Sequence, residues 1–174
     1  MSNITTSQTI GPFSHEAWHW AADASAPSRI ESSAPLITVS GTVYDGDGIP
    51  VNDAQIEAWL PEAETCEATQ AVPGFRRYPS NEDGGFTLRL SVPPNPNPAG
   101  EPVAYVTVFA RGLTKHQFTA IFLEDDAALA QSAILAQVPD ERRQTLVAIK
   151  TGDGMYRWDI WLQTDKETVF FDYV

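Results

Sequence analysis

Apolar and polar residues alternate along much of the chain with a period of two, which is the period of β-strands. Residues 36–44, Leu-Ile-Thr-Val-Ser-Gly-Thr-Val-Tyr, are rich in β-branched side chains, which favour strands. In residues 55–60 the apolar Ile56 and Ala58 fall on one face, and Glu57 and Trp59 on the other. The same kind of pattern predicts further strands at residues 86–92, 103–110, 118–123, 146–150 and 155–162.

Turn and loop signals separate these strands. Gly, Asp and Asn cluster at residues 45–48, 81–85 and 152–154, and the last cluster predicts a hairpin between its flanking strands. Residues 61–79 and the proline-rich residues 93–98 are expected to be loops, because proline cannot donate a hydrogen bond to a sheet. Residues 125–137, rich in Ala, Leu and Gln, predict a helix, and a shorter helix is expected at about residues 14–23.

Many short strands with closely spaced turns predict an all-β fold. We expect an antiparallel β-sandwich with an N-terminal arm and one or two short helices. The length of 174 residues suits one domain with a substantial core. The arm is expected over residues 1–33, where the sequence is polar, and the sandwich over residues 34–174.

The charge of the chain limits its partners. Eleven basic and 23 acidic side chains give a formal net charge of -12, which argues against nucleic acid and favours solubility. An anionic substrate therefore needs a local basic group. Cys66 is the single cysteine, so no disulfide forms within the chain, and no membrane span or export signal is evident. These features predict a cytoplasmic protein without a membrane partner.

Residues 15–19, His-Glu-Ala-Trp-His, match a zinc-binding pattern in which a helix carries two histidines on one face. A zinc hydrolase is therefore a remote alternative. Such a site needs a third ligand, and the chain has only one other histidine, His116. The pattern also lies in the arm, where a surface helix with incidental histidines is the simpler interpretation.

Residues 7–13, Ser-Gln-Thr-Ile-Gly-Pro-Phe, resemble the opening of the intradiol ring-cleaving dioxygenases, and His15 stands where a histidine often follows in that family. Further segments are similar to the family in the same order along the chain: residues 41–48, 56–59, 109–112, 122–126, 142–148, 156–160 and 167–172. The resemblance spans nearly the whole sequence. It is sharpest with the iron-free α-type subunits of the heteromeric members, which act on protocatechuate.

The resemblance implies that this chain binds no metal and carries no catalytic residue of its own. Members of the family hold ferric iron with two tyrosines and two histidines, and the histidines form an H-x-H pair on one strand. The matching positions here are Val103 and Tyr105. Tyr78 and Tyr105 are conceivable phenolate ligands, but no histidine pair completes the set, and ordinary sandwich tyrosines are the simpler interpretation. The resemblance therefore places Fe(3+) on a β-type partner subunit in a higher hetero-oligomer.

Four residues are candidates for the substrate pocket. By resemblance, Thr9, Gly11 and Pro12 in the arm line the partner's site, where Gly11 permits close backbone approach and Pro12 stiffens the turn. Arg111 points to the same pocket by resemblance, and its guanidinium can position an aromatic carboxylate. The alternatives are that the Gly-Pro pair only starts a helix and that Arg111 forms a structural ion pair with an acid such as Asp125 or Asp126.

The resemblance implies that the chain completes the active site for O2-dependent intradiol cleavage of protocatechuate to 3-carboxy-cis,cis-muconate. We expect an enzyme subunit that is inactive alone. The main alternative is a non-catalytic binding module of the transthyretin-like or carboxypeptidase-regulatory-like kind, in which sequences like residues 40–45, 48–50 and 83–86 also occur. Such a module needs neither residues 7–13 nor residues 109–112, so these segments discriminate between the two.

Overall fold

The computed structural model describes residues 19–61, 66–92 and 100–172. Strands dominate these ranges and form one nine-stranded sheet in the order β3-β2-β5-β6-β7-β8-β1-β4, with β9 beside β1. The strands are β1 (Leu36–Tyr44), β2 (Gln55–Trp59), β3 (Phe75–Pro79), β4 (Gly85–Ser91), β5 (Ala104–Phe109), β6 (Gln117–Leu123), β7 (Val147–Gly152), β8 (Met155–Arg157) and β9 (Ile160–Trp161).

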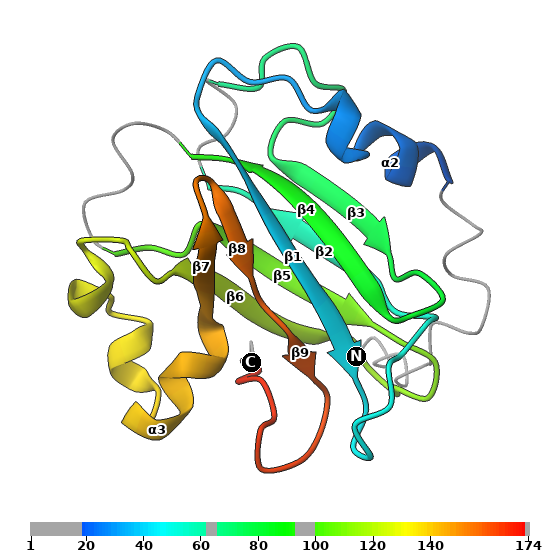
Figure 1. The fold of residues 1–174 in the computed structure, drawn as a ribbon, viewed down its shortest axis with the longest axis vertical. Helices are drawn as coiled ribbons and strands as arrows, with labels where there is room; N and C mark the ends of the chain where they lie inside the picture. The colour runs from blue at the N-terminus through cyan, green and yellow to red at the C-terminus, as the bar shows by residue number, and fades with distance from the viewer. Residues whose placement is uncertain (1–18, 62–65, 93–99, 173–174) are drawn as a thin grey trace, which may run out of the picture.

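The sheet folds over itself, so that β1, β4 and β8 lie in front of β2, β5 and β6 (Figure 1). Its two ends also approach each other: Arg76 on β3 donates its Nε–H to the carbonyl oxygen of Arg89 on β4 at 2.6 Å. The predicted all-β sandwich is therefore confirmed. The pairings β1–β8, β1–β9 and β6–β7 are parallel, while the others are antiparallel. A parallel β7 follows from the crossover of residues 124–146, which carries the chain from β6 to the other layer.

Two apolar clusters stabilise this arrangement. The larger cluster lies between the layers and includes the inward residues of β1 and β4, such as Val39 and Leu88. It forms because β1 alternates strictly between buried and half-buried positions. The smaller cluster lies on the outer face of β6, where Phe122 packs with Leu135, Val138 and Leu146 from the crossover. The outer face of β6 is therefore also part of the core, and the crossover is its cover.

The strands predicted from alternation are found close to their expected bounds, and β7 and β8 form the expected hairpin. Two details differ. Phe75–Pro79, expected to be loop, is strand β3, paired with β2. The strand expected at residues 155–162 is broken between β8 and β9, because the Asp159 carboxylate accepts the backbone N–H of Thr42 at 2.8 Å, where a backbone carbonyl would otherwise pair.

The helix predicted at residues 125–137 is wrong. The segment holds two short 3-10 turns, η3 (Leu129–Gln131) and η4 (Leu135–Gln137). Between them Ser132 is extended and buried, and its hydroxyl accepts the N–H of Leu135. The separate turns let Leu135 and Val138 reach the outer face of β6, so tertiary packing overrides helix propensity.

The remaining helical segments are short: α2 (His19–Ala24), η1 (Pro27–Arg29), α3 (Asp140–Arg143) and η5 (Gln144–Leu146). The helix expected at about residues 14–23 is thus present over the part that the structure describes, and α2 lies beside β3 (Figure 1). The division into an arm over residues 1–33 and a sandwich over residues 34–174 stays a prediction. None of the helices among the described residues is long and apolar enough to cross a membrane.

Candidate functional site

Arg111 lies in the tight turn that joins β5 to β6. The turn closes through the N–H of Leu113, which donates to the carbonyl of Ala110 at 3.2 Å. Gly112 follows Arg111 with φ at 91°, a conformation that strongly favours glycine. This tight turn places the Arg111 side chain at the surface, where it is 67% exposed.

Asp53, in the turn before β2, holds Arg111 from one side. The Nε of Arg111 lies 3.0 Å from Oδ2 of Asp53, whose side chain is only 13% exposed. The contact is an ion pair without hydrogen-bond geometry, since the buried Oδ2 makes no hydrogen bond to any residue that the structure describes. The two terminal nitrogens of Arg111 make no hydrogen bond to any residue in the described ranges, and they remain available to a partner or ligand.

The structure contains the ion pair anticipated as the alternative for Arg111, but its acid is Asp53 and not Asp125 or Asp126. Asp125 instead accepts hydrogen bonds from Lys150 Nζ at 2.6 Å and from the Tyr156 hydroxyl at 2.8 Å. These two donors, Lys150 first, lower the pKa of the Asp125 carboxyl below its usual range. Burial, followed by the hydrogen bond to Asp125, raises the pKa of Tyr156. These hydrogen bonds join the end of β6 to the β7–β8 hairpin. Asp125 therefore pairs with Lys150, and Arg111 pairs with Asp53.

Sequence reasoning missed Asp53. Its position in a turn, next to Asn52, carries no chemical signature, since Asn and Asp are common in turns for conformational reasons. Only the antiparallel pairing of β2 with β5, which places Gln55 opposite Phe109, brings the turn before β2 next to the turn after β5.

The other pocket candidates, Thr9, Gly11 and Pro12, lie outside the described residues, so their expected place in a pocket stays a prediction. His15 of the zinc-like pattern also lies outside them, and His19 is the first residue of α2. His116 is exposed on the β5–β6 connection, and its ring lies 5.5 Å from that of Phe109 and 4.6 Å from that of Phe118.

Tyr78 and Tyr105 do not fit a shared metal site. Tyr78 on β3 pairs with Ile56 of β2, and Tyr105 on β5 pairs with Trp59 of β2. Because side chains alternate along a strand and these partners are three residues apart, the two tyrosines project from opposite faces of the sheet. Tyr78 packs against the larger core cluster and Tyr105 against the smaller one. Within the described ranges, no three His, Cys, Asp or Glu residues gather as a metal site would require.

The arrangement around Arg111 is suited to binding rather than to acid–base chemistry. A guanidinium stays protonated at all accessible pH values, and its two terminal nitrogens suit the two oxygens of a carboxylate. Because Asp53 balances its charge, the pair attracts an anion through directed hydrogen bonds more than through net charge.

No family model matches the chain, but individual proteins do. The chain is 32% identical to the protocatechuate 3,4-dioxygenase alpha chain of Pseudomonas putida, over 97% of this chain and 96% of that one. It is 33% identical to the protein of the same name from Burkholderia cepacia, with the same coverage.

Solved structures share the fold. The dioxygenase domain of a carbohydrate-binding fusion protein from Streptomyces sp. SirexAA-E superposes with a TM-score of 0.57 at 19% identity, covering 79% of this chain and 84% of that one. An intradiol ring-cleavage dioxygenase from Tetranychus urticae gives a TM-score of 0.56 at 10% identity, covering 75% of this chain and 82% of that one. The length and level of the sequence match, together with this shared fold, show that the chain belongs to the protocatechuate 3,4-dioxygenase alpha chains, within the intradiol ring-cleaving dioxygenases.

Proposed function

We propose that this chain is the iron-free α-type subunit of a protocatechuate 3,4-dioxygenase and completes an active site whose metal lies on a β-type partner. The observation that carries the proposal is the match of nearly the whole chain to two curated alpha chains. An alpha chain by its name has a counterpart of another type. The match also favours a dioxygenase subunit over a transthyretin-like binding module.

The position of Arg111 supports a role at the boundary with the partner. A buried or fully paired arginine would serve this chain alone, whereas Arg111 is exposed and held only through its Nε. In the proposed assembly its terminal nitrogens bind the substrate carboxylate and orient the ring. The ion pair with the largely buried Asp53 restrains the guanidinium, which reduces the entropy lost on binding.

The arm contributes shape in this proposal. Thr9, Gly11 and Pro12 line the pocket, where Gly11 allows the backbone to approach the ligand and Thr9 offers a short hydroxyl. Together with Arg111 they exclude water and orient the substrate. In this proposal these residues bind and orient the substrate, and the chain moves no proton in the reaction.

The chemistry that the partner's Fe(3+) supplies is activation of the catechol ring toward O2, with intradiol cleavage to 3-carboxy-cis,cis-muconate. The chain's residues described here do not duplicate that metal site, since Tyr78 and Tyr105 lie on opposite faces. The proposal places the hetero-oligomer in the cytoplasm, with protocatechuate and O2 as its small-molecule partners.

The test is metal content and ring cleavage for this chain alone, for a β-type subunit, and for the two co-expressed. We expect iron and activity in the co-expressed pair and neither in this chain alone. Stoichiometric iron in the isolated chain, or equal activity of the β-type subunit with and without it, would refute the proposal.

The Arg111→Met variant of the pair tests the substrate contact. A lost charge-assisted hydrogen bond of about 1.5–3 kcal/mol raises KM for protocatechuate roughly tenfold or more. Cleavage of catechol, which has no carboxylate, should change little. Lys115→Met is the matched control, because Lys115 is an exposed cation in the same connection and is 60% exposed. If Arg111→Met changed KM equally for protocatechuate and catechol, Arg111 would not bind the substrate carboxylate.

A further inference from the structure

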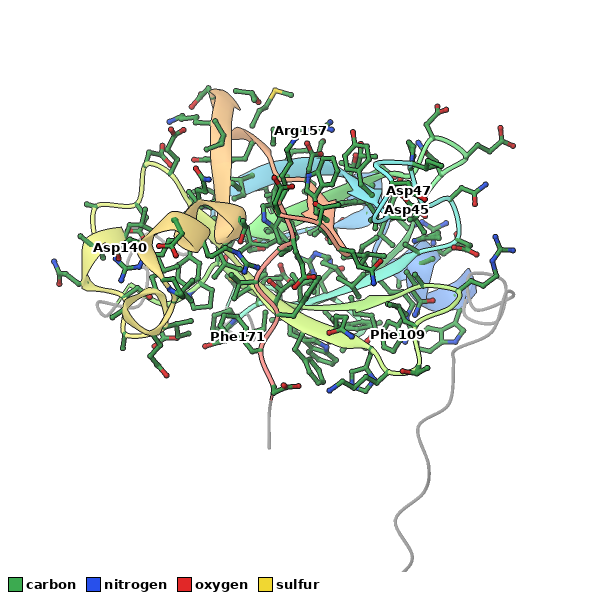
Figure 2. All side chains as sticks on the ribbon, turned by 90° about the horizontal axis from the view of Figure 1, so that it is seen from below. Asp45, Asp47, Phe109, Asp140, Arg157 and Phe171 are labelled. Carbon is green, nitrogen blue, oxygen red and sulfur yellow. The ribbon has the colours of Figure 1, made fainter. Side chains whose placement is uncertain are left out.

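A cationic hollow lies away from the Arg111 turn. Its volume is about 300 Å³, and its walls come from η5, β7, the ends of β8 and β9, and the segment after β9. Figure 2 shows Arg157, at this hollow, on the opposite side of the molecule from Phe109, the residue that ends β5 before the Arg111 turn. The lining residues are Gln144, Thr145, Val147, Ile149, Arg157, Trp158, Asp159, Trp161, Lys166 and Thr168.

Arg157 is held in the hollow by a single nitrogen. Its Nη2 lies 2.6 Å from Oδ1 of Asp159 and donates to the Thr42 hydroxyl at 3.0 Å. Its Nε and Nη1 make no hydrogen bond to any described residue, and the side chain is 46% exposed. The Asp159 carboxylate accepts the Thr42 N–H as well, so its position is fixed. Arg157 is therefore anchored on one side and open on the other.

Lys166 adds a second positive charge. Its ammonium lies 5.1 Å from the centre of the Trp161 ring, and it has no carboxylate partner among the residues that the structure describes. With Asp159 as the single acid in the lining, the hollow carries one net positive charge. The chain as a whole carries -12, so this hollow is a local exception to the acidic surface.

The remaining exposed wall is apolar. Ile149 is 48% exposed on β7, and Val147 and Trp161 are half-buried beside it. An apolar wall next to two cations matches a ligand that has a flat apolar body and one anionic end. The volume lies at the lower limit for small-molecule sites, which suits a single ring with its substituents.

We propose that this hollow is a binding site for a small aromatic carboxylate, distinct from the site proposed at Arg111. The carboxylate binds the open nitrogens of Arg157 and the ammonium of Lys166, and the ring lies against Ile149, Val147 and Trp161. Asp159 orients Arg157 without occupying its free edge.

The test is isothermal titration of the full chain, alone or in the assembly in which it purifies, with 4-hydroxybenzoate as the probe and phenol as its uncharged counterpart. We expect 4-hydroxybenzoate to bind saturably, with one binding site per chain at the hollow. Phenol should bind with at least tenfold lower affinity. Arg157→Met and Lys166→Met should each weaken the binding by about tenfold, the effect of one charge-assisted hydrogen bond.

A control variant separates this site from other cations. Lys115→Met, at an exposed cation outside the lining of the hollow, should leave binding at the hollow unchanged. Lys166→Met keeps the test valid if Arg157→Met disturbs the fold, because Lys166 has no ion pair in the described structure to lose. Absence of saturable binding, equal binding of phenol, or unchanged affinity in both Arg157→Met and Lys166→Met would overturn the proposal.

Discussion

Replacing Glu67 by Gln should destabilise the fold more than any surface change. Glu67 is 0% exposed and Arg76 is 1% exposed, and the two form a bidentate ion pair. Glu67 also accepts the Gly74 N–H at 2.7 Å and a hydrogen bond from the Ser91 hydroxyl. The pair therefore joins the loop before β3, β3 itself and β4 at the place where the two ends of the sheet meet.

Glu67→Gln keeps the shape but leaves the Arg76 charge buried without a counter-charge. Breaking one side of a buried pair costs about 3–5 kcal/mol. That is a large part of the roughly 5–15 kcal/mol by which a domain is stable, and for a chain of this size it lowers Tm by about 6–20 °C. The measurement is urea unfolding followed by circular dichroism at neutral pH.

The pH dependence gives the prediction a second, independent result. Burial tends to raise the pKa of Glu67, but hydrogen bonds from Arg76, Ser91 and the Gly74 N–H outweigh it and lower the pKa. The stability that Glu67 contributes is therefore fully present above its unfolded pKa of about 4.3 and is lost as the pH falls through the lower folded value. The difference between wild type and Glu67→Gln should shrink in acid.

Asp172→Asn is the matched control, because Asp172 pairs with Lys115 at 3.0 Å with side chains 79% and 60% exposed. Its cost should stay below about 1 kcal/mol. If Glu67→Gln lowered the free energy of unfolding by less than about 1 kcal/mol at neutral pH, or by the same amount in acid as at neutral pH, the buried Glu67–Arg76 pair would not stabilise the fold as argued.

Three further substitutions test individual contacts. Thr119→Val should stabilise the fold by about 1 kcal/mol in urea unfolding, because the buried Thr119 hydroxyl has no hydrogen-bond partner among the described residues; a loss of stability would contradict this. Gly41→Ala should unfold the chain or cost more than about 3 kcal/mol, since a Cβ would lie 1.8 Å from the Trp158 carbonyl oxygen; normal expression and Tm would contradict this. Tyr156→Phe should raise the pKa of Asp125 toward its usual value without reaching it, because Lys150 remains, and NMR titration of the carboxyl measures the shift.

Alternation predicted the strands because most of them bury one face in a single cluster. In β1, Val39, Gly41 and Val43 are buried while Ser40 and Thr42 between them are half-buried, so the sequence alone shows the pattern without knowledge of the partner strands. The Gly-rich turns were equally legible, because the need for positive φ at Gly84 and Gly154 is local.

The misses share one physical cause, which is contact with residues far away in the sequence. β3 was hidden because Arg76 faces inward, and a buried arginine makes sense only once Glu67 lies beside it. Residues 125–137 have helix-forming composition, but the outer face of β6 selects two separate turns instead. The Asp53 contact with Arg111 depends on the pairing of β2 with β5.

The two exposed arginines at Arg111 and Arg157 are built alike, which bears on how an acidic chain can bind an anion. Each forms an ion pair with one aspartate through a single nitrogen: Arg111 with the distant Asp53, and Arg157 with Asp159, two residues further along the chain. With a net charge of -12, an unanchored arginine would find many carboxylates within reach of its long side chain. Pairing with one aspartate restricts the guanidinium to one orientation, with its free nitrogens facing outward. The aspartate also neutralises the charge of the arginine. Both sites should therefore discriminate ligands by the geometry of a carboxylate more than by charge, which distinguishes them from a site that works by general electrostatic attraction.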